Sequence, residues 1–424
     1  MINMEELNLV DYFFIYSLVS IWMLLLVNII LSLAGYKYYL KTLNNSEIKK
    51  IKDEEYPTVS ILVPAHNEEK VIGRTVKSIL LLNYPRNKME LIVINDNSSD
   101  NTKKILEQIQ KEYEYYNFKI ISTDNVTGGK GKSNALNIGY KHSSGDFIAV
   151  YDADNTPDKN ALKYLIENII EDRSLGAVIG KFRTRNKERN MLTRFINIET
   201  LSFQWMCQAG RWNLLNLCTI PGTNFVVRKD VIKKLNGWDP KAIAEDTEIS
   251  FRIYELGYKI KFVPNSVTWE QEPENLKVWF KQRTRWVKGN IYVLLKYFKN
   301  MFKKSRRNII FDIFYFFSVY FLFLSSVLIS DILFIMSVFF NINLNVTGNF
   351  NVLWILAYVL FVLEISLTLT LEKGESNRKN LIFVSIMYFT YCQMWMVVAV
   401  KGIIQYIRDK LLKKEVKWYK TERF

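Results

Sequence analysis

Long apolar segments constrain the fold of this chain more than any other feature of its sequence. Residues 12–33 carry no charged side chain, and further apolar runs occupy residues 309–342, 352–371 and 381–400. A helix that crosses a bilayer needs about 20 apolar residues. The sequence therefore predicts one N-terminal membrane helix, a long hydrophilic portion, and a C-terminal group of membrane helices.

The charges around the first apolar run predict its orientation. Acidic residues precede the run and lysines follow it: Glu5, Glu6 and Asp11 come before, and Lys37, Lys41, Lys49, Lys50 and Lys52 come after. Positive flanks favour the cytoplasmic side, so the hydrophilic portion is expected in the cytoplasm. A cleaved signal peptide is disfavoured, because its basic residues would precede the apolar core.

Composition limits the partners and the chemistry. The formal net charge is +15, which suits nucleic acid, anionic lipid or an anionic small substrate. Much of this charge flanks the apolar runs, where membrane anchoring accounts for it, so we expect no nucleic-acid partner. Three cysteines without paired spacing and only two histidines exclude a disulfide framework and a multi-histidine metal site.

Between residues 58 and 177, short apolar runs alternate with helical patterns, which is typical of an α/β domain. Strands are expected at residues 59–63, 91–94, 118–121 and 146–151. Ligands bind beyond the carboxyl ends of strands in open α/β sheets. Polar or turn-forming residues stand at these ends and are candidate ligand contacts: Pro64, Ala65, His66, Asn67, Glu68, Asn95, Asp96, Asp152 and Asp154.

Asp152 and Asp154 end an apolar strand with one residue between them, so both side chains lie on the same face of the chain. Paired carboxylates suit Mg²⁺ or Mn²⁺ bound to a diphosphate, although an isolated pair of this kind also occurs in solvated turns. Asp96 ends a neighbouring strand and faces the same ligand, or else caps the helix that follows.

Residues 128–133 form a glycine loop with two lysines, Lys130 and Lys132, before a helical pattern. Glycines allow close backbone approach to a ligand, and a lysine there neutralises phosphate. The spacing of the phosphate-loop motif is not met, so a plain surface loop is an equal alternative.

Residues 244–290 carry acids at one end and a cationic cluster at the other. Asp246, beside Glu245, is a candidate general base, and both acids also complement a helix dipole. Arg283 and Arg285 match phosphate geometry, and Trp286 can stack on a sugar ring. Taken alone, the cluster from Gln282 to Trp286 is equally typical of a charged helix beside a membrane.

The ordered set of these motifs resembles the processive family-2 glycosyltransferases, which include cellulose, chitin, hyaluronan and poly-N-acetylglucosamine synthases. The set comprises Asp96, Asp152-x-Asp154, Glu245-Asp246 and Gln282-x-x-Arg285-Trp286, framed by membrane helices. The resemblance implies an α/β catalytic domain of GT-A fold combined with transmembrane α-helices. It also implies a UDP-sugar donor and a metal-dependent transfer that inverts the anomeric carbon.

The resemblance assigns a role to each matching residue. Asp246 would be the base beside Glu245, Asp154 the ligand of Mg²⁺ or Mn²⁺, and Trp286 the acceptor contact. The donor would contact Pro64, Ala65, Asn67, Glu68, Asp96, Lys132, Asp152, Gln282, Arg283 and Arg285. Two positions depart from the family pattern, because Asn95 and Ala244 stand where an aspartate and a threonine are common. The segment 418–423 loosely resembles a cytoplasmic element near the nucleotide of hyaluronan-type synthases.

These inferences divide the chain into five parts. They are a membrane helix with a basic linker (1–55), the catalytic domain (56–290), an amphipathic interfacial segment (291–308), the C-terminal membrane region (309–407) and a basic tail (408–424). Four simple spans would leave that tail outside, against the positive-inside rule. A cytoplasmic tail requires residues 309–342 to cross twice, or one late segment to be re-entrant or interfacial.

The expected protein is a multi-pass plasma-membrane enzyme with a cytoplasmic catalytic domain. It would polymerise, and export, an exopolysaccharide from a UDP-sugar, with UDP-N-acetylglucosamine favoured. A single sugar addition to a lipid is the main alternative, and a non-enzymatic transporter or scaffold a distant one. The implied partners are the UDP-sugar, a growing polysaccharide or glycolipid acceptor, membrane lipids and, as an open alternative, an accessory membrane subunit.

Overall fold

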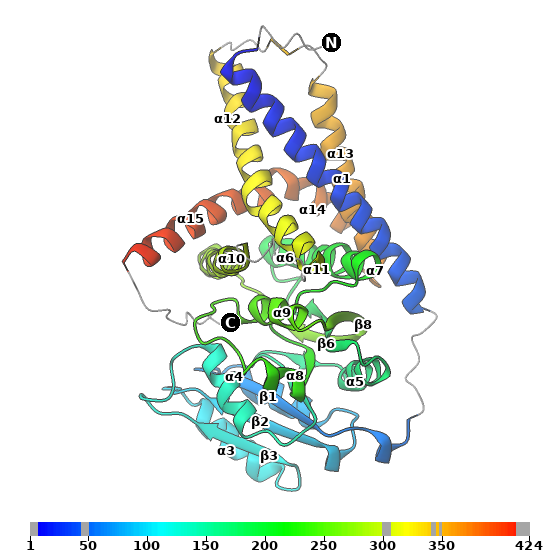
Figure 1. Ribbon diagram of the computed structural model, residues 1–424, viewed down its shortest axis with the longest axis vertical. Coiled ribbons are helices and arrows are strands. Elements are labelled where there is room, and N and C mark those ends of the chain that lie inside the picture. The colour runs from blue at the N-terminus through cyan, green and yellow to red at the C-terminus, as the bar shows by residue number, and fades with distance from the viewer. Residues whose placement is uncertain (1–6, 44–50, 299–306, 341–344, 347–349, 413–424) are drawn as a thin grey trace.

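The computed structural model describes residues 7–43, 51–298, 307–340, 345–346 and 350–412. Figure 1 shows three tiers, with a sheet domain below, a middle layer that includes helices α6, α7 and α10, and long helices α1, α12 and α13 above. The expected C-terminal element at 418–423 lies outside the described residues. The two lower tiers position the cavity described below.

A mixed sheet of eight strands has the order β3-β2-β1-β4-β7-β6-β8-β5. The first four strands in this order are parallel, and β7 joins β4 to β6 by antiparallel pairing on both sides. The four strands predicted from the sequence are confirmed as β1 to β4. The strand bounds are β1 Val59–Ala65, β2 Met89–Asn95, β3 Phe118–Ser122, β4 Phe147–Val150, β5 Thr156–Pro157, β6 Leu175–Thr184, β7 Phe225–Arg228 and β8 Lys259–Glu270.

Helices cover both faces of the sheet, which explains why β1 and β2 are buried along their whole length. Side chains of β1 alternate, with Ile61 in the core on one face and Leu62 in the core on the other. Helices α2, α3 and α5 supply the first core, and α4, α8 and α9 supply the second. Their bounds are α2 Ile72–Leu80, α3 Thr102–Glu112, α4 Lys132–Lys141, α5 Ala161–Glu171, α8 Lys229–Lys234 and α9 Glu245–Glu255.

The middle tier contains helices in which aromatic and charged residues are mixed. Two of these aromatics, Phe195 and Trp205, belong to the core and are 3% and 2% exposed. The segment Phe203–Gly210 is a π-helix, called η4, that continues α6 directly into α7. The bounds are α6 Met191–Ser202, α7 Arg211–Leu215 and α10 Leu276–Phe298. Helix α10 therefore runs without a break across the expected boundary at residue 290.

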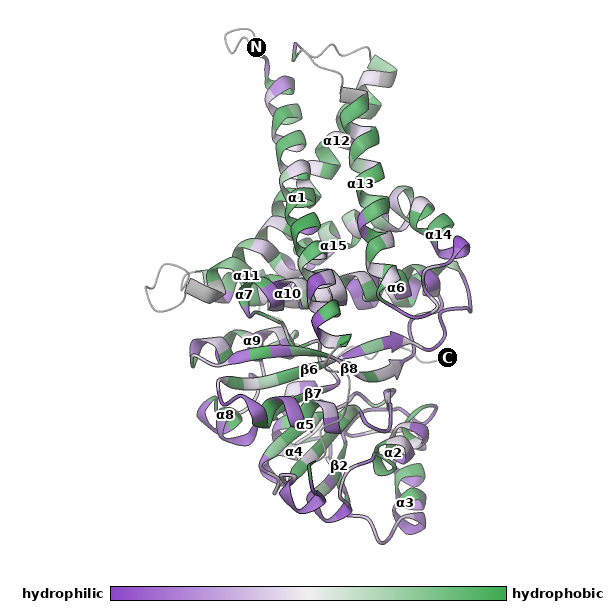
Figure 2. Cartoon of the chain, turned by 90° about the vertical axis from the view of Figure 1, so that its right-hand side faces the viewer, coloured by the Kyte–Doolittle hydropathy of each residue, from purple (hydrophilic) through white to green (hydrophobic). Residues whose placement is uncertain are grey.

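The upper tier holds three helices long and apolar enough to cross a membrane within the described residues: Leu9–Leu43, Ile313–Ser337 and Val352–Thr370. Figure 2 shows that these helices are hydrophobic over most of their length, whereas α3 and α8 carry hydrophilic surfaces. The helix Leu9–Leu43 is α1, and Val352–Thr370 lies within α13, Phe350–Thr370. The helix Ile313–Ser337 begins in α11, Arg307–Phe317, continues through the π-helix η5, Ser318–Phe323, and ends in α12, Leu324–Phe340.

The last apolar run, predicted as a span over residues 381–400, is not one straight helix. It divides into α14, Arg378–Phe389, and α15, Tyr391–Leu411, with a bend of 42° between them. In Figure 1, α15 lies across the direction of α1, α12 and α13 rather than alongside them.

The upper tier is joined to the sheet domain by buried polar contacts just after α13. Glu372 accepts hydrogen bonds from Trp205 (2.8 Å) and Lys181 (2.5 Å), and Glu375 pairs with Arg183 at 2.9 Å. Both glutamates are at most 4% exposed. A buried carboxylate is costly unless it is paired, so these cations of β6 hold the end of α13 onto the sheet.

Helix α1 crosses η4 at two glycines that allow the backbones to touch. A Cβ atom on Gly35 would lie 2.0 Å from the carbonyl oxygen of Trp205, and one on Gly210 would lie 2.3 Å from that of Leu31. Helices approach this closely only where a small residue stands at the crossing. Tyr38, one turn further along α1, donates a hydrogen bond of 2.6 Å to the carbonyl of Phe262 in β8.

We predict that Gly35→Ala destabilises the protein by about 2–3 kcal/mol, because the new methyl group meets backbone that cannot yield as a side chain can. The control is Gly73→Ala in α2, where the Cβ would lie 3.4 Å from the side chain of Ile105, an ordinary contact. Thermal unfolding of the protein in lipid nanodiscs should show a lower midpoint for Gly35→Ala alone. Equal midpoints for the two variants would contradict the close crossing.

Candidate active site

A cavity of about 410 Å³ lies between the carboxyl edge of the sheet and helices α9 and α10. This volume is within the range of small-molecule sites. The predicted residues that line it come from five separate stretches of the chain: Pro64, Glu68, Lys132, Asp152, Asp154, Glu245, Asp246, Gln282, Arg283, Arg285 and Trp286. Three other predicted donor contacts, Ala65, Asn67 and Asp96, are not part of this lining.

Asp96 instead organises the glycine loop beside the cavity. Its carboxylate accepts hydrogen bonds from the Thr123 hydroxyl at 2.9 Å and from the Gly129 backbone amide at 3.0 Å. Asn67, in the left-handed region with φ of 56°, accepts a hydrogen bond from the Ser99 backbone amide at 2.7 Å. Both residues therefore shape the loops next to the cavity. Their roles as donor contacts stay predictions.

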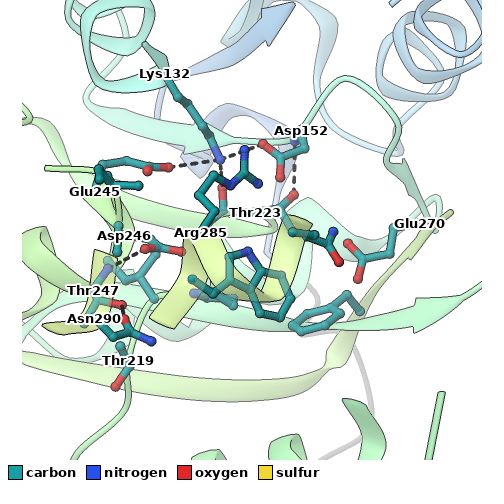
Figure 3. A pocket seen from close by; sticks show the side chains of 18 of the residues that line it. Lys132, Asp152, Thr219, Thr223, Glu245, Asp246, Thr247, Glu270, Arg285 and Asn290 are labelled. Carbon is teal, nitrogen blue, oxygen red and sulfur yellow. Dashed lines mark hydrogen bonds and ion pairs between the residues drawn. The ribbon is translucent and has the colours of Figure 1, made fainter. Parts of the chain in front are cut away.

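Lys132, at the start of α4, joins two of the predicted motifs. Its ammonium lies 2.7 Å from Asp152 and 3.2 Å from Glu245, and it donates to the carbonyl of Gly222 at 2.8 Å. Figure 3 shows these contacts converging on one side of the cavity. Burial alone would lower the pKa of this lysine, but the two carboxylates outweigh it and raise that pKa. Lys132 is therefore a fixed positive charge in the site.

Asp246 faces the same cavity from the first turn of α9. Removal from water, followed by the negative charge of Glu245, raises the pKa of the Asp246 carboxyl to about 7, against the lowering effect of Lys132. Gly222, with φ of +88°, brings backbone so near that a Cβ there would lie 2.9 Å from Asp246 Oδ2. A carboxylate with a pKa near neutrality is suited to accept a proton from a substrate hydroxyl.

Two further acids, not singled out from the sequence, line the cavity opposite Asp246. Glu270 ends β8 and Glu272 follows it, so the pair repeats the spacing of Asp152 and Asp154. Burial, followed by the charges of Glu272, Asp154 and Asp152, raises the pKa of Glu270 well above its ordinary value. The Glu-x-Glu at a strand end was the signal that could have identified this pair.

This arrangement of carboxylates fits a divalent cation. Asp154 is 3% exposed and belongs, with Asp152, Glu270 and Glu272, to one group of hard oxygen donors that repel each other. Among the residues that the structure describes, no three acids, histidines or cysteines form a ready-made ligand set. Magnesium commonly takes one or two carboxylates and completes its shell with phosphate and water.

The two arginines of the cluster on α10 lie in different settings. Arg283 is 1% exposed and donates to Glu199 of α6 at 2.7 Å, and its guanidinium lies 3.9 Å from the ring centre of Trp286. The sequence predicted a diphosphate contact for Arg283, whereas its guanidinium already engages Glu199. Arg285 extends into the cavity below Lys132 in Figure 3. Trp286 is 40% exposed and so offers a ring surface.

Comparison with known proteins places this site in a family. The model of the family described as "Glycosyltransferase like family 2" matches residues 57–289. The chain is 49% identical over 411 residues to the "Probable glycosyltransferase YdaM" of Bacillus subtilis (strain 168), an alignment that covers 97% of each chain. It is 34% identical over 273 residues to the poly-beta-1,6-N-acetyl-D-glucosamine synthase of Staphylococcus aureus (strain COL), covering 64% of each.

A solved structure has a similar fold over nearly the whole chain. It is the mannosyltransferase PcManGT from Pyrobaculum calidifontis in complex with GDP-Man and Mn²⁺, with a TM-score of 0.61 at 17% sequence identity, covering 91% of this chain and 99% of that one. The likeness is one of fold, and it agrees with the GT-A-like mixed sheet described above. The predicted fold class is thus confirmed, and the chain belongs to the family-2 glycosyltransferases.

Proposed function

We propose that this enzyme transfers N-acetylglucosamine from its UDP derivative to the end of a growing β-linked polysaccharide, which it exports across the membrane. The observation that carries the proposal is the position of Asp246. Its carboxyl, with a pKa raised to about 7, faces a cavity that also holds Lys132, Asp154 and Trp286. The similarity to a poly-beta-1,6-N-acetyl-D-glucosamine synthase supports the choice of sugar.

The proposed reaction needs one base and a stabilised leaving group. The acceptor hydroxyl loses its proton to the Asp246 carboxylate while its oxygen forms a bond to the anomeric carbon. The bond from that carbon to the diphosphate oxygen breaks, its electron pair leaves with UDP, and the anomeric carbon is inverted. Lys132 and Arg285 are placed to offset the charge that develops on the diphosphate.

The acids on the sheet side of the cavity would hold Mg²⁺ or Mn²⁺, with Asp154 as the main ligand and Asp152, Glu270 and Glu272 nearby. A divalent cation bound there would neutralise diphosphate charge as a Lewis acid. The presence of Mn²⁺ in the structure of PcManGT supports the need for a divalent cation. Lys132 already pairs with Asp152, so we assign Asp152 to the nucleotide side of the site.

We also infer that three helices cross the membrane, and that α14 and α15 lie along its cytoplasmic surface. Exposed apolar residues on α15 recur at helical spacing and form one stripe, made of Val397, Val400, Ile404, Ile407 and Leu411. The opposite face of α15 packs on α10, where a Cβ on Gly402 would lie 2.6 Å from the side chain of Val287. Three crossings leave α15 on the same side as the catalytic domain, which satisfies the positive-inside rule.

The protein reconstituted in lipid should release UDP from UDP-N-acetylglucosamine and yield a ladder of oligomers, in the presence of Mg²⁺ or Mn²⁺. Asp246→Asn should lower the transfer rate by about 10²- to 10⁴-fold, since the amide cannot accept the proton. Mass spectrometry of the product and a UDP assay are the measurements.

Asp230→Asn is the control, because Asp230 is 61% exposed on α8 and pairs only with Lys234 in the ion pairs of the described residues. Wild-type activity in Asp246→Asn, or transfer that persists in EDTA, would contradict the mechanism. A single-sugar glycolipid instead of a ladder would favour the alternative of one addition to a lipid.

The pH dependence of the transfer rate should reflect the ionisation of Asp246, since the base must be deprotonated to act. We expect kcat/KM for the acceptor to fall as the pH falls through about 7, the value to which the pKa of Asp246 is raised. Glu245→Gln should move this limb toward lower pH, because it removes a neighbouring negative charge that raises the pKa of Asp246. An unchanged limb in Glu245→Gln would show that another group is titrating.

A cysteine-labelling experiment tests the membrane arrangement. Leu411→Cys at the end of α15 should react with an impermeant maleimide only after the cells are opened. A cysteine in place of Tyr115, which is 88% exposed on the surface of the catalytic domain, should behave in the same way. Labelling of Leu411→Cys in intact cells would mean that the last helices cross the membrane.

A further inference from the structure

Glu199 organises the side of the cavity nearest the membrane. The residue lies on α6, and its two carboxylate oxygens accept three hydrogen bonds from two other helices. Arg283 of α10 donates at 2.7 Å, Tyr391 of α15 donates at 2.8 Å to the same oxygen, and Trp395 of α15 donates at 2.7 Å to the other. One side chain thus ties α6, α10 and α15 together.

Arg283, one of the partners of Glu199, lies against two tryptophans of the cavity. The Arg283 guanidinium lies 3.9 Å from the ring centre of Trp286 and 5.8 Å from that of Trp395. Glu199, Arg283, Trp286 and Trp395 all line the cavity, and Phe182 and Phe203 do so beside them. The carboxylate therefore fixes the arginine, and the arginine stabilises an indole that remains 40% exposed.

Trp395 reaches this cavity from a part of the chain outside the family match at residues 57–289. Its indole nitrogen is directed to Glu199, and its ring meets that of Trp279 edge-on, with 6.0 Å between centroids and 81° between planes. Tyr391 receives a further hydrogen bond of 3.0 Å from Trp279. These contacts restrict the rotation of Trp395, so its place in the cavity wall is held from several sides.

Such a wall is suited to bind a carbohydrate. Aromatic rings pack on the apolar face of a sugar, and charged hydrogen-bonding groups at their edge meet its hydroxyls. The residues of this wall come from α6, α10 and α15, which lie between the sheet and the long apolar helices in Figure 1, whereas Asp152 and Asp154 follow β4 in the sheet domain. A saccharide there would be the part of the acceptor already made, not the donor sugar.

We propose that Glu199 is a positioning residue, which together with Trp395 builds an acceptor subsite for the sugar units behind the one being extended. This inference rests on the proposed glycosyl transfer, and it adds two requirements for acceptor binding. Acceptor binding depends on α15, and it depends on acceptor length, because a monosaccharide lacks the sugar units behind the one being extended.

The test compares Glu199→Gln and Trp395→Phe with the wild type in lipid nanodiscs. Glu199→Gln keeps the size of the side chain and removes its charge, and Trp395→Phe keeps an aromatic ring, though a smaller one, and removes the indole N–H. We expect each to raise the KM for a β-linked N-acetylglucosamine tetrasaccharide by about tenfold, the effect of losing one charge-assisted hydrogen bond. The KM for UDP-N-acetylglucosamine and the slow release of UDP to water should stay within twofold.

Glu188→Gln serves as the matched control, since Glu188 also pairs with an arginine, Arg194, but is 62% exposed and does not line the cavity. The double variant Glu199→Gln/Trp395→Phe should raise the KM for the tetrasaccharide no more than either single variant does, because the two residues act as one unit. A rise in the donor KM, or losses that multiply in the double variant, would overturn the proposal, since a general loss of fold would produce them.

Direct binding separates this proposal from the proposed reaction. Calorimetric titration with the tetrasaccharide, and with its glucose counterpart, needs no turnover. Weaker binding in Trp395→Phe supports the subsite even if UDP-N-acetylglucosamine is not a donor. Equal affinities in the wild type and Trp395→Phe, or no binding of either saccharide to the wild type, overturn it while leaving transfer to be judged by UDP release.

Discussion

Electrostatic repulsion among the carboxylates around one cavity is the constraint on which this structure depends. Asp152, Asp154, Glu245, Asp246, Glu270 and Glu272 all line it. Their proximity is tolerated because Lys132 bridges Asp152 and Glu245, and because the pKa values of Asp246 and Glu270 are raised. The same repulsion prepares the site for its chemistry, since it favours a proton on one side and a divalent cation on the other.

Scaffold contacts hold these charges together against their repulsion. The sheet brings the loop after β4 and the end of β8 to the same edge. The Thr223 hydroxyl accepts a hydrogen bond of 3.1 Å from the backbone amide of Asp152. On the side of the long apolar helices, Glu199 and the Glu372–Glu375 loop use largely buried ion pairs to fasten helices to the sheet domain. Because these pairs are shielded from water, each is expensive to break and fixes its elements in one arrangement.

The fold was predictable where the chemistry is local. Apolar runs of strand length, such as that of β2, and the polar residues at their ends are visible in the sequence because burial of a whole strand requires a continuous apolar run. Asp152 was predicted on this ground, and Glu245 and Asp246 were predicted from the start of a helical pattern and from the family resemblance; all three line the cavity. The Glu270 pair had an equal signal, whereas Glu199 and Trp395 had none, since a single acid or tryptophan in an apolar helix is commonplace.

By itself, the sequence determined the class of protein: helices long and apolar enough to cross a membrane, around an α/β domain whose strand ends carry acids in a family-specific order. Burial periodicity, bilayer thickness and motif spacing are all properties of short stretches, so they can be recognised without coordinates. Only the tertiary structure decided that Arg283 pairs with Glu199 and that Lys132 lies between Asp152 and Glu245. It also decided that the last apolar run bends at residue 390. The physical reason is that pairing of buried charges depends on distance in space, and the partners lie far apart in the chain: Lys132 and Glu245 are 113 positions apart, and Lys181 and Glu372 are 191 positions apart.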